Sequence, residues 1–157
     1  MKPVLQALLI ADHVYADAIT GKKIVAGIFH RLWFKRPPTP EEKGDAAQSV
    51  IQVGSSGHRA GSPFCYISLT EVHGEQHFEL RFVDLGSDTT VFGTRFAFKS
   101  ENPLQTIEQI LPLPTLPATK AGVFAFELLW NGEQLGSHRI IVDEIAEEKK
   151  TDDSGSR

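Results

Sequence analysis

Apolar and polar residues alternate along several short runs of the chain, and clusters of turn residues separate these runs. Strict alternation is typical of a β-strand that has one buried face and one exposed face. The clearest runs cover residues 65–70, 76–85 and 89–98, and they are joined by tight turns at 73–75 and 86–88. We therefore expect these three segments to form an antiparallel three-stranded meander.

The same alternation predicts which side chains of the meander lie in the core. Successive side chains of a strand point to opposite faces, so every second residue shares a face. The expected core residues of the second and third strands are all Phe or Leu: Phe78, Leu80, Phe82, Phe92, Phe96 and Phe98. On the second strand the residues between them, His77, Glu79 and Arg81, should face solvent.

Two earlier runs, 4–14 and 24–34, are apolar at both parities. A strand that is covered on both faces has this pattern. Gly27 interrupts the second run, and glycine within a strand marks a bulge or a close approach of another part of the chain. Residues 49–53 form a further, short candidate strand.

The C-terminal part of the body contains the strongest local signal. Apolar runs at 123–130 and 133–142 flank the dipeptide Asn131-Gly132. A two-residue hairpin turn needs positive φ at both positions, which Asn and Gly adopt more readily than other residues do. We therefore expect a β-hairpin here.

Residues 102–111 leave two alternatives open. Asn102 is a suitable cap for a helix that begins at Pro103, with an apolar stripe along one side. The segment is equally suited to an irregular edge, because Pro112, Pro114 and Pro117 follow and proline is confined to sheet edges. We expect one or two helical turns that lead into an extended edge segment.

Together these elements predict an all-β fold, a two-sheet antiparallel β-sandwich of immunoglobulin-like or similar type. We expect about seven to eight strands and at most one short helix. The sandwich domain should cover residues 1–143 and include a long loop at 36–63, which is rich in Pro, Gly and Ser. Residues 144–157 should form a polar, flexible tail.

Charge and cysteine content exclude several classes of protein. The net charge of the 157-residue chain is −4, and residues 143–157 contribute six acidic and three basic residues, so the body is nearly neutral. A nearly neutral body argues against a nucleic-acid partner, because phosphate binding depends on clustered Lys and Arg.

The apolar stretch 4–11 is too short to span a membrane, so we expect no membrane partner. A lone cysteine, Cys65, fits a reducing compartment, and we expect a cytoplasmic protein.

A metal site at residues 73–77 is the first candidate for chemistry. Glu75 and His77 stand two residues apart and would share a face of the strand, and His73 lies across the turn. A third or fourth ligand, such as His58 or Asp84, would have to come from elsewhere in the fold. The alternative is that residues 73–77 form an ordinary polar hairpin tip.

Four aspartates near strand ends are calcium-ligand candidates, although Asp at such positions is usually turn chemistry: Asp12, Asp17, Asp84 and Asp88. Residues 54–61 form a Gly- and Ser-rich segment whose backbone N–H groups, with Arg59, would suit an anion. The segment lacks the Gly-Lys-Ser/Thr ending of a P-loop and is equally typical of a flexible linker. Cys65 shares the parity of Ile67 and Leu69 and is expected to be buried.

Several short stretches of the sequence resemble one uncharacterised family of small bacterial single-domain β-sandwich proteins. They are Ala11-Asp12-His13-Val14, Asp17 with Thr20-Gly21-Lys22, Ala26-Gly27-Ile28-Phe29, the expected hairpin of Ser68-Leu69-Thr70 and His73-Gly74-Glu75, and Gly122-Val123-Phe124-Ala125-Phe126 with Asn131-Gly132. The similarity covers roughly residues 5–143. It implies a sandwich fold and no assigned activity.

No catalytic motif and no cofactor motif is recognisable, so we expect a non-enzymatic interaction module or assembly subunit with a protein partner or with itself. The alternative is a metal- or small-ligand-binding protein or an enzyme that uses residues 73–77 or 54–61. Trp33 and Trp130 each end an apolar run and are either contact residues or part of the core rim. We expect the C-terminal hairpin with Trp130 to provide the contact surface, unless its outer strand is already paired within the domain.

Overall fold

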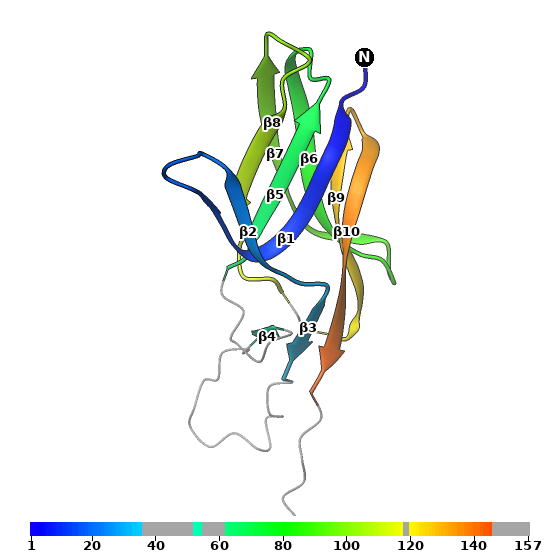
Figure 1. The fold of residues 1–157 in the computed structure, drawn as a ribbon. Helices are drawn as coiled ribbons and strands as arrows, with labels where there is room; N and C mark the ends of the chain where they lie inside the picture. The colour runs from blue at the N-terminus through cyan, green and yellow to red at the C-terminus, as the bar shows by residue number, and fades with distance from the viewer. Residues whose placement is uncertain (36–51, 55–61, 118–119, 146–157) are drawn as a thin grey trace, which may run out of the picture.

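The computed structural model describes residues 1–35, 52–54, 62–117 and 120–145, and this part of the chain is all β, without a helix (Figure 1). The strands are β1 (Val4–Ala16), β2 (Lys23–Ile28), β3 (Arg31–Phe34), β4 (Gln52–Gly54), β5 (Phe64–Thr70), β6 (Gly74–Asp84), β7 (Thr89–Ser100), β8 (Ile107–Pro112), β9 (Gly122–Trp130) and β10 (Glu133–Glu144). The all-β prediction is confirmed. The described strands exceed the seven to eight expected, partly because the run 24–34 forms two strands.

The strands form two sheets. The four-stranded sheet has the order β2-β1-β5-β8, and the six-stranded sheet has the order β4-β3-β10-β9-β6-β7. Neighbours are antiparallel except β3 and β10, which are parallel, with Arg31 opposite Ile141 and Phe34 opposite Glu144. The prediction of two purely antiparallel sheets is therefore wrong at this pair. Alternation along a strand does not reveal the direction of its neighbour, so the sequence pattern could not show it.

One core lies between the sheets. Ile10, Cys65 and Ile67 of the four-stranded sheet and Phe82 and Phe126 of the six-stranded sheet belong to one cluster of buried side chains. The Phe82 ring lies 4.7 Å from the Phe126 ring, measured between centroids. Offset aromatic contacts at such distances stabilise a core beyond the area they bury. Phe78, Leu80 and Phe98 are buried and Phe92 and Phe96 pack against the cluster, so the predicted core faces of β6 and β7 are confirmed.

The predicted meander is wrong at its first turn. β6 and β7 pair along their length, but β5 pairs with β1 and β8 and belongs to the other sheet. The connection between β5 and β6 therefore crosses from one sheet to the other instead of closing a hairpin. Glu71 and Gly74 have positive φ there, and the Glu71 N–H donates to the Pro103 carbonyl oxygen at 2.9 Å. Turn residues mark where a strand ends, not which strand it joins next.

The run 24–34 also changes sheet. β2 ends at Ile28 and β3 begins at Arg31, so Phe29 and His30 form the corner between the two sheets. Gly27 has a φ of 75°, and a Cβ atom there would lie 2.5 Å from an Asp12 carboxylate oxygen. The close approach that the glycine predicted is therefore confirmed, and Asp12 of β1 is the neighbour.

The C-terminal hairpin is confirmed. β9 and β10 pair antiparallel from Trp130 and Glu133 onward, with Asn131 at φ 49° and Gly132 at φ 80°. β9 is also paired with β6, and the end of β10 is paired with β3. β9 is thus paired on both sides, whereas β10 meets β3 only along residues 141–144, and Trp130 packs against the core cluster. The contact of Trp130 with the core agrees with the alternative that Trp130 belongs to the core rim, and the contact role of the hairpin stays a prediction.

Residues 102–112 contain no helix. The Asn102 side chain accepts a hydrogen bond from the Leu104 N–H, and the Asn102 carbonyl accepts one from the Gln105 N–H. These bonds close a turn in place of the predicted helical turns. β8 follows as the outer strand of its sheet, so the expected edge segment is confirmed. The short strand expected at 49–53 corresponds to β4, whereas most of the loop 36–63 and residues 146–157 of the tail lie outside the described residues.

Candidate functional site

The predicted metal-ligand set is divided between two separate contacts. His73 Nε2 lies 3.5 Å from a carboxylate oxygen of Glu71, and His77 Nε2 lies 3.8 Å from one of Glu75. The His77 side chain is 76% exposed. Within the described parts of the chain, no three His, Cys, Asp or Glu side chains are grouped as a metal site would require. His58, the suggested additional ligand, lies outside the described residues.

Two of the four aspartates considered for calcium, Asp17 and Asp84, form hydrogen bonds within their own turns. Asp17 Oδ1 accepts hydrogen bonds from the Ile19 and Thr20 N–H groups, and these bonds hold the pKa of Asp17 below its usual value. Asp84 accepts hydrogen bonds from Ser87 and from the Gly86 N–H and forms an ion pair with Lys120. The Lys120 contact is the main cause that lowers the pKa of Asp84 to about 2.

The other two candidates also carry no chemistry in the described structure. Arg59 and residues 55–61 lie outside the described residues, so the anion site stays a prediction. Cys65 is completely buried, as expected, and burial raises the pKa of its thiol to about 12. A thiol in that state is not a nucleophile at neutral pH.

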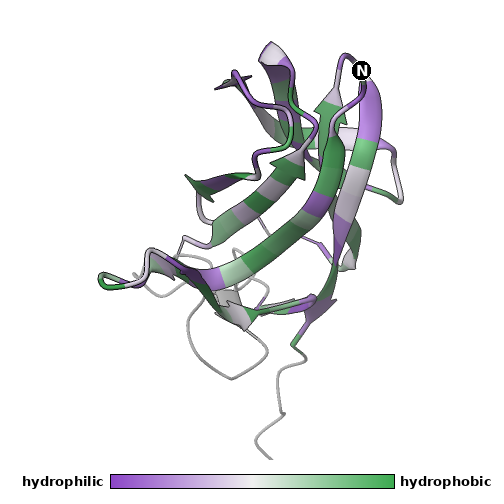
Figure 2. Cartoon of the chain, turned by 45° about the horizontal axis from the view of Figure 1, so that its top comes forward, coloured by the Kyte–Doolittle hydropathy of each residue, from purple (hydrophilic) through white to green (hydrophobic). Residues whose placement is uncertain are grey.

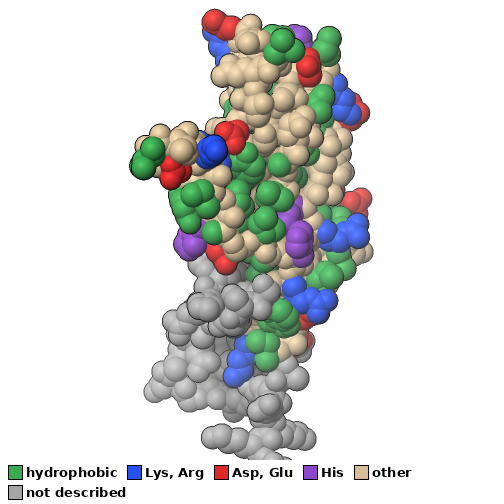
Figure 3. Space-filling model, viewed as in Figure 1, with side chains coloured by type: hydrophobic (Ala, Val, Ile, Leu, Met, Phe, Trp, Pro, Cys, Tyr) green, Lys and Arg blue, Asp and Glu red, His purple; other side chains and the backbone are tan. Residues whose placement is uncertain are grey.

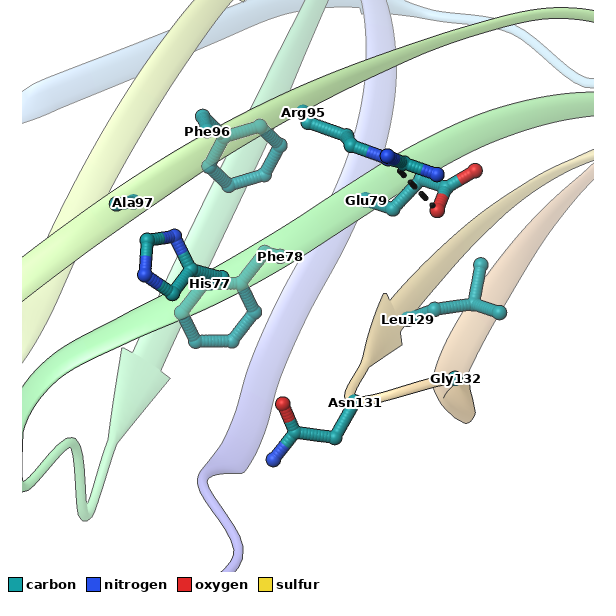
Figure 4. A pocket seen from close by; sticks show the side chains of 9 residues that line it. All are labelled: His77, Phe78, Glu79, Arg95, Phe96, Ala97, Leu129, Asn131 and Gly132. Atoms are coloured by element: carbon teal, nitrogen blue, oxygen red, sulfur yellow. Dashed lines mark hydrogen bonds and ion pairs between the residues drawn. The ribbon is translucent and has the colours of Figure 1, made fainter.

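A groove of about 510 Å³ lies beside β6, β7 and the β9–β10 turn (Figure 4). His77, Glu79 and Arg95 stand around it, with Leu129 and the Asn131-Gly132 turn on the other side. The Arg95 Nε lies 3.4 Å from Glu79 Oε2, so the two charges of the groove are paired with each other. The groove holds neither a Ser nor a Cys nucleophile, and its paired charges define no ligand class.

The outer face of the four-stranded sheet is the most distinctive surface in the described structure. Alternation and register place one parity of each strand on this face, opposite the core. These outward residues are mostly apolar: Leu9, Ala11 and Tyr15 of β1, Ile24, Ala26 and Ile28 of β2, Phe64 and Tyr66 of β5, and Ile110 and Pro112 of β8. We call this set the apolar outer face. Figure 3 shows hydrophobic side chains gathered over β1 and β2.

Three large side chains of the apolar outer face are well exposed. Tyr15 is 51% exposed, Ile28 45% and Ile24 39%. Polar groups lie among and beside them: His13 packs near Phe64, and the Tyr66 hydroxyl donates to Glu108. Figure 2 shows hydrophobic residues along much of β1. The sequence contained a signal for this face, because the run 4–14 is apolar at both parities. No other element of the described structure packs against the outward residues of that run.

A buried histidine that the sequence pattern did not single out lies where the two sheets meet. His138 of β10 is 4% exposed, and its Nε2 lies 2.8 Å from the Phe29 carbonyl oxygen at the corner between β2 and β3. The His30 ring stacks on it, with 4.4 Å between the ring centroids. Burial, with a smaller contribution from His30, lowers the pKa of His138. His138 stands at an inward parity of β10, so the alternation along this strand could have predicted that it is buried.

We predict that His138 makes the protein less stable as the pH falls below 6.5, the pKa of the free side chain. The pKa of His138 is lower in the folded state than in the unfolded state, so the unfolded state binds more protons below that pH. Stability present above pH 6.5 is therefore lost as the pH falls through the folded-state pKa. Denaturant unfolding at several pH values should show a steeper loss for the wild type than for His138→Gln.

His13→Gln, which replaces an exposed histidine in the same way, is the matched control. Asp84 acts in a separate window: its lowered pKa adds stability that is lost only as the pH falls from 3.8 towards about 2. Equal pH dependence in the wild type and in His138→Gln would show that His138 is not the responsible group.

No protein-family model matches the chain, and no curated protein is detectably similar to it. The resemblance to small bacterial β-sandwich proteins therefore stays a prediction. No helix in the described segments is both long enough and apolar enough to cross a membrane.

Proposed function

We propose that the protein is a non-enzymatic interaction module that binds another protein through the apolar outer face. The observation that carries this proposal is the exposure of Tyr15, Ile24 and Ile28 on a sheet face whose central residues are also apolar. A soluble domain rarely exposes a contiguous apolar surface unless something binds there.

The shape and composition of this face favour a protein partner over a small molecule. A small-ligand site is a concave pocket that encloses most of its ligand, whereas this surface is the broad side of a sheet. Its exposed side chains include Tyr, and Tyr and Phe are enriched at the centres of protein interfaces. The Tyr66–Glu108 hydrogen bond adds a polar contact towards the β8 edge.

Two further expectations from the sequence belong to this proposal. A cytoplasmic location is supported by the lone Cys65, which is buried as a thiol. An immunoglobulin-like relationship, as in small bacterial β-sandwich proteins, is supported by two facing β-sheets around one core. Sandwich domains of this kind host many functions, so we infer the binding role from the surface and not from the fold.

The test is comparative capture of partners on immobilised protein from lysate of the source cells. Ile28→Lys places a charge in the apolar outer face, and we expect it to remove most of the partner that the wild type retains, by about tenfold or more. Val123→Lys is the matched control, because Val123 of β9 is 38% exposed and lies on the outer side of the six-stranded sheet. The control should retain the partner.

Two results would contradict the proposal. The first is a wild type that captures no protein at a level above the bare support. The second is a partner retained equally by the wild type, Ile28→Lys and Val123→Lys. Because Ile28 is exposed on β2, the lysine substitution should change the free energy of unfolding by only about 0.5 kcal/mol, which a denaturant melt of each variant verifies.

A further inference from the structure

A second surface, separate from the apolar outer face, is the free edge of β7. β7 is the last strand of the six-stranded sheet and pairs with β6 on one side only; no described strand lies against its other side. It has 12 residues, twice the length of the edge strands β2 and β8. Unlike β8, it contains no proline. A long edge without proline presents a row of backbone N–H and C=O groups that another strand can pair with.

The core-facing side of β7 is only partly covered. Phe92 and Phe96 point towards the core and contact Phe82 and Phe78, but both remain half-exposed. Phe98, further along the strand, is buried. A further strand beside β7 would cover the exposed parts of Phe92 and Phe96 and so extend the core across the edge.

The outward side of β7 carries only positive charges. Arg95 and Lys99 are its charged residues. The Arg95 side chain is 85% exposed, and its Nε contacts Glu79 of the same sheet. Like charges directly opposite each other on neighbouring strands are destabilising. The positions of Arg95 and Lys99 therefore decide which registers of a self-pairing are acceptable.

One antiparallel register makes β7 complementary to itself. With a two-fold axis at Thr94, Phe92 lies opposite Phe96 of the second copy, and Thr94 lies opposite Thr94 of the second copy. Arg95 then faces Gly93 of the second copy. The register is regular from Phe92 to Phe96, and Val91 is the extra residue of a bulge against β6. Aromatic pairs and Thr–Thr pairs are favourable across strands, and no like charges face each other. An axis at Arg95 would instead oppose the two arginines.

We propose that β7 pairs with β7 of a second copy of this chain in the register centred on Thr94. The two six-stranded sheets then form one continuous sheet with both cores on the same side. This is an isologous, closed dimer, the commonest symmetry of homo-oligomers. The apolar outer face belongs to the other sheet, so the dimer leaves the proposed partner surface uncovered by β7 pairing.

Sedimentation equilibrium with a pair of oppositely charged variants tests the edge and the register together. The wild type should sediment as a dimer at micromolar concentration. Thr94→Lys and Thr94→Asp each place like charges opposite each other at the axis and should each weaken the dimer by at least about tenfold. An equimolar mixture of the two variants should restore association, because the lysine of one copy then faces the aspartate of the other. Thr106→Lys, at an exposed threonine outside β7, is the matched control and should behave as the wild type.

Three outcomes would overturn the proposal: a monomeric wild type, a Thr94→Lys variant that dimerises as the wild type does, or a mixture that stays monomeric. A circular dichroism spectrum of each variant verifies the fold. If the Thr94 variants do not fold, sedimentation of the wild type decides instead, and a monomer at micromolar concentration overturns the proposal. Ile28→Lys should leave the dimer intact. A result that contradicts β7 pairing is therefore distinguishable from one that contradicts partner binding through the apolar outer face.

Discussion

Replacing Phe82 by Ala should lower the free energy of unfolding by about 3–5 kcal/mol, as is typical for a buried Phe. The Phe82 ring is 1% exposed and lies 5.4 Å from the ring of Phe92, 5.3 Å from Phe124 and 4.7 Å from Phe126. Removing it leaves a cavity among three other rings and also removes their contacts. A denaturant melt at neutral pH measures the loss.

Phe64→Ala is the control for this prediction. Phe64 is the same residue type in a strand, but it lies half-exposed on the apolar outer face. Its replacement should cost about 1–2 kcal/mol, because less apolar area is lost from the interior. Equal losses for the two variants would mean that the aromatic cluster around Phe82 is not the centre of the core.

Replacing Trp130 by Ala should also be strongly destabilising, by about 3 kcal/mol, the lower end of the range for buried aromatic residues. Trp130 ends β9, faces Phe78 of β6 in register and packs against the core cluster while remaining partly exposed. A contact role for the hairpin predicts the opposite pattern, with lost association and little change in stability. A melt and a sedimentation run on the same variant separate the two roles.

Trp33→Ala is a useful comparison for that experiment. Trp33 lies half-buried on β3 and is absent from the core cluster, so its loss should cost less than the loss of Trp130. A Trp130→Ala variant with wild-type stability would make the hairpin a candidate contact surface again.

The strands could be predicted from the sequence, and so could the two pairs that tight turns join, β6 with β7 and β9 with β10. The other pairings could not. Alternation located β6 and β7 and the core residues Phe78 and Phe82, because burial of one face constrains every second residue. It assigned β5 to the wrong neighbour, because the turn at 73–75 has the same residue types whether the chain forms a hairpin or crosses between sheets. The parallel pairing of β3 with β10 depends on contacts between distant segments, which no local pattern records.

The surfaces were predictable only in part. Apolar residues at both parities of 4–14 predicted that both faces of β1 are buried. In the structure one face packs in the core and the other belongs to the apolar outer face. His138 was not singled out, although it stands at an inward parity, because the Phe29 carbonyl and the exposed His30 ring that it contacts come from a corner about 109 residues earlier in the chain. The histidines that were singled out, His73 and His77, lie instead at exposed positions beside single carboxylates.

The corner at Phe29 has a consequence for the order of events during synthesis. His138 and the Phe29 carbonyl that it contacts are separated by 109 residues, and β3 pairs with the very last strand of the body. At translation rates of about 5–20 residues per second, β3 waits on the order of 5–20 s for its partner to be made. β3 thus cannot pair with β10 until the chain has been synthesised through β10, so the corner at Phe29 is completed late in the folding of the described residues.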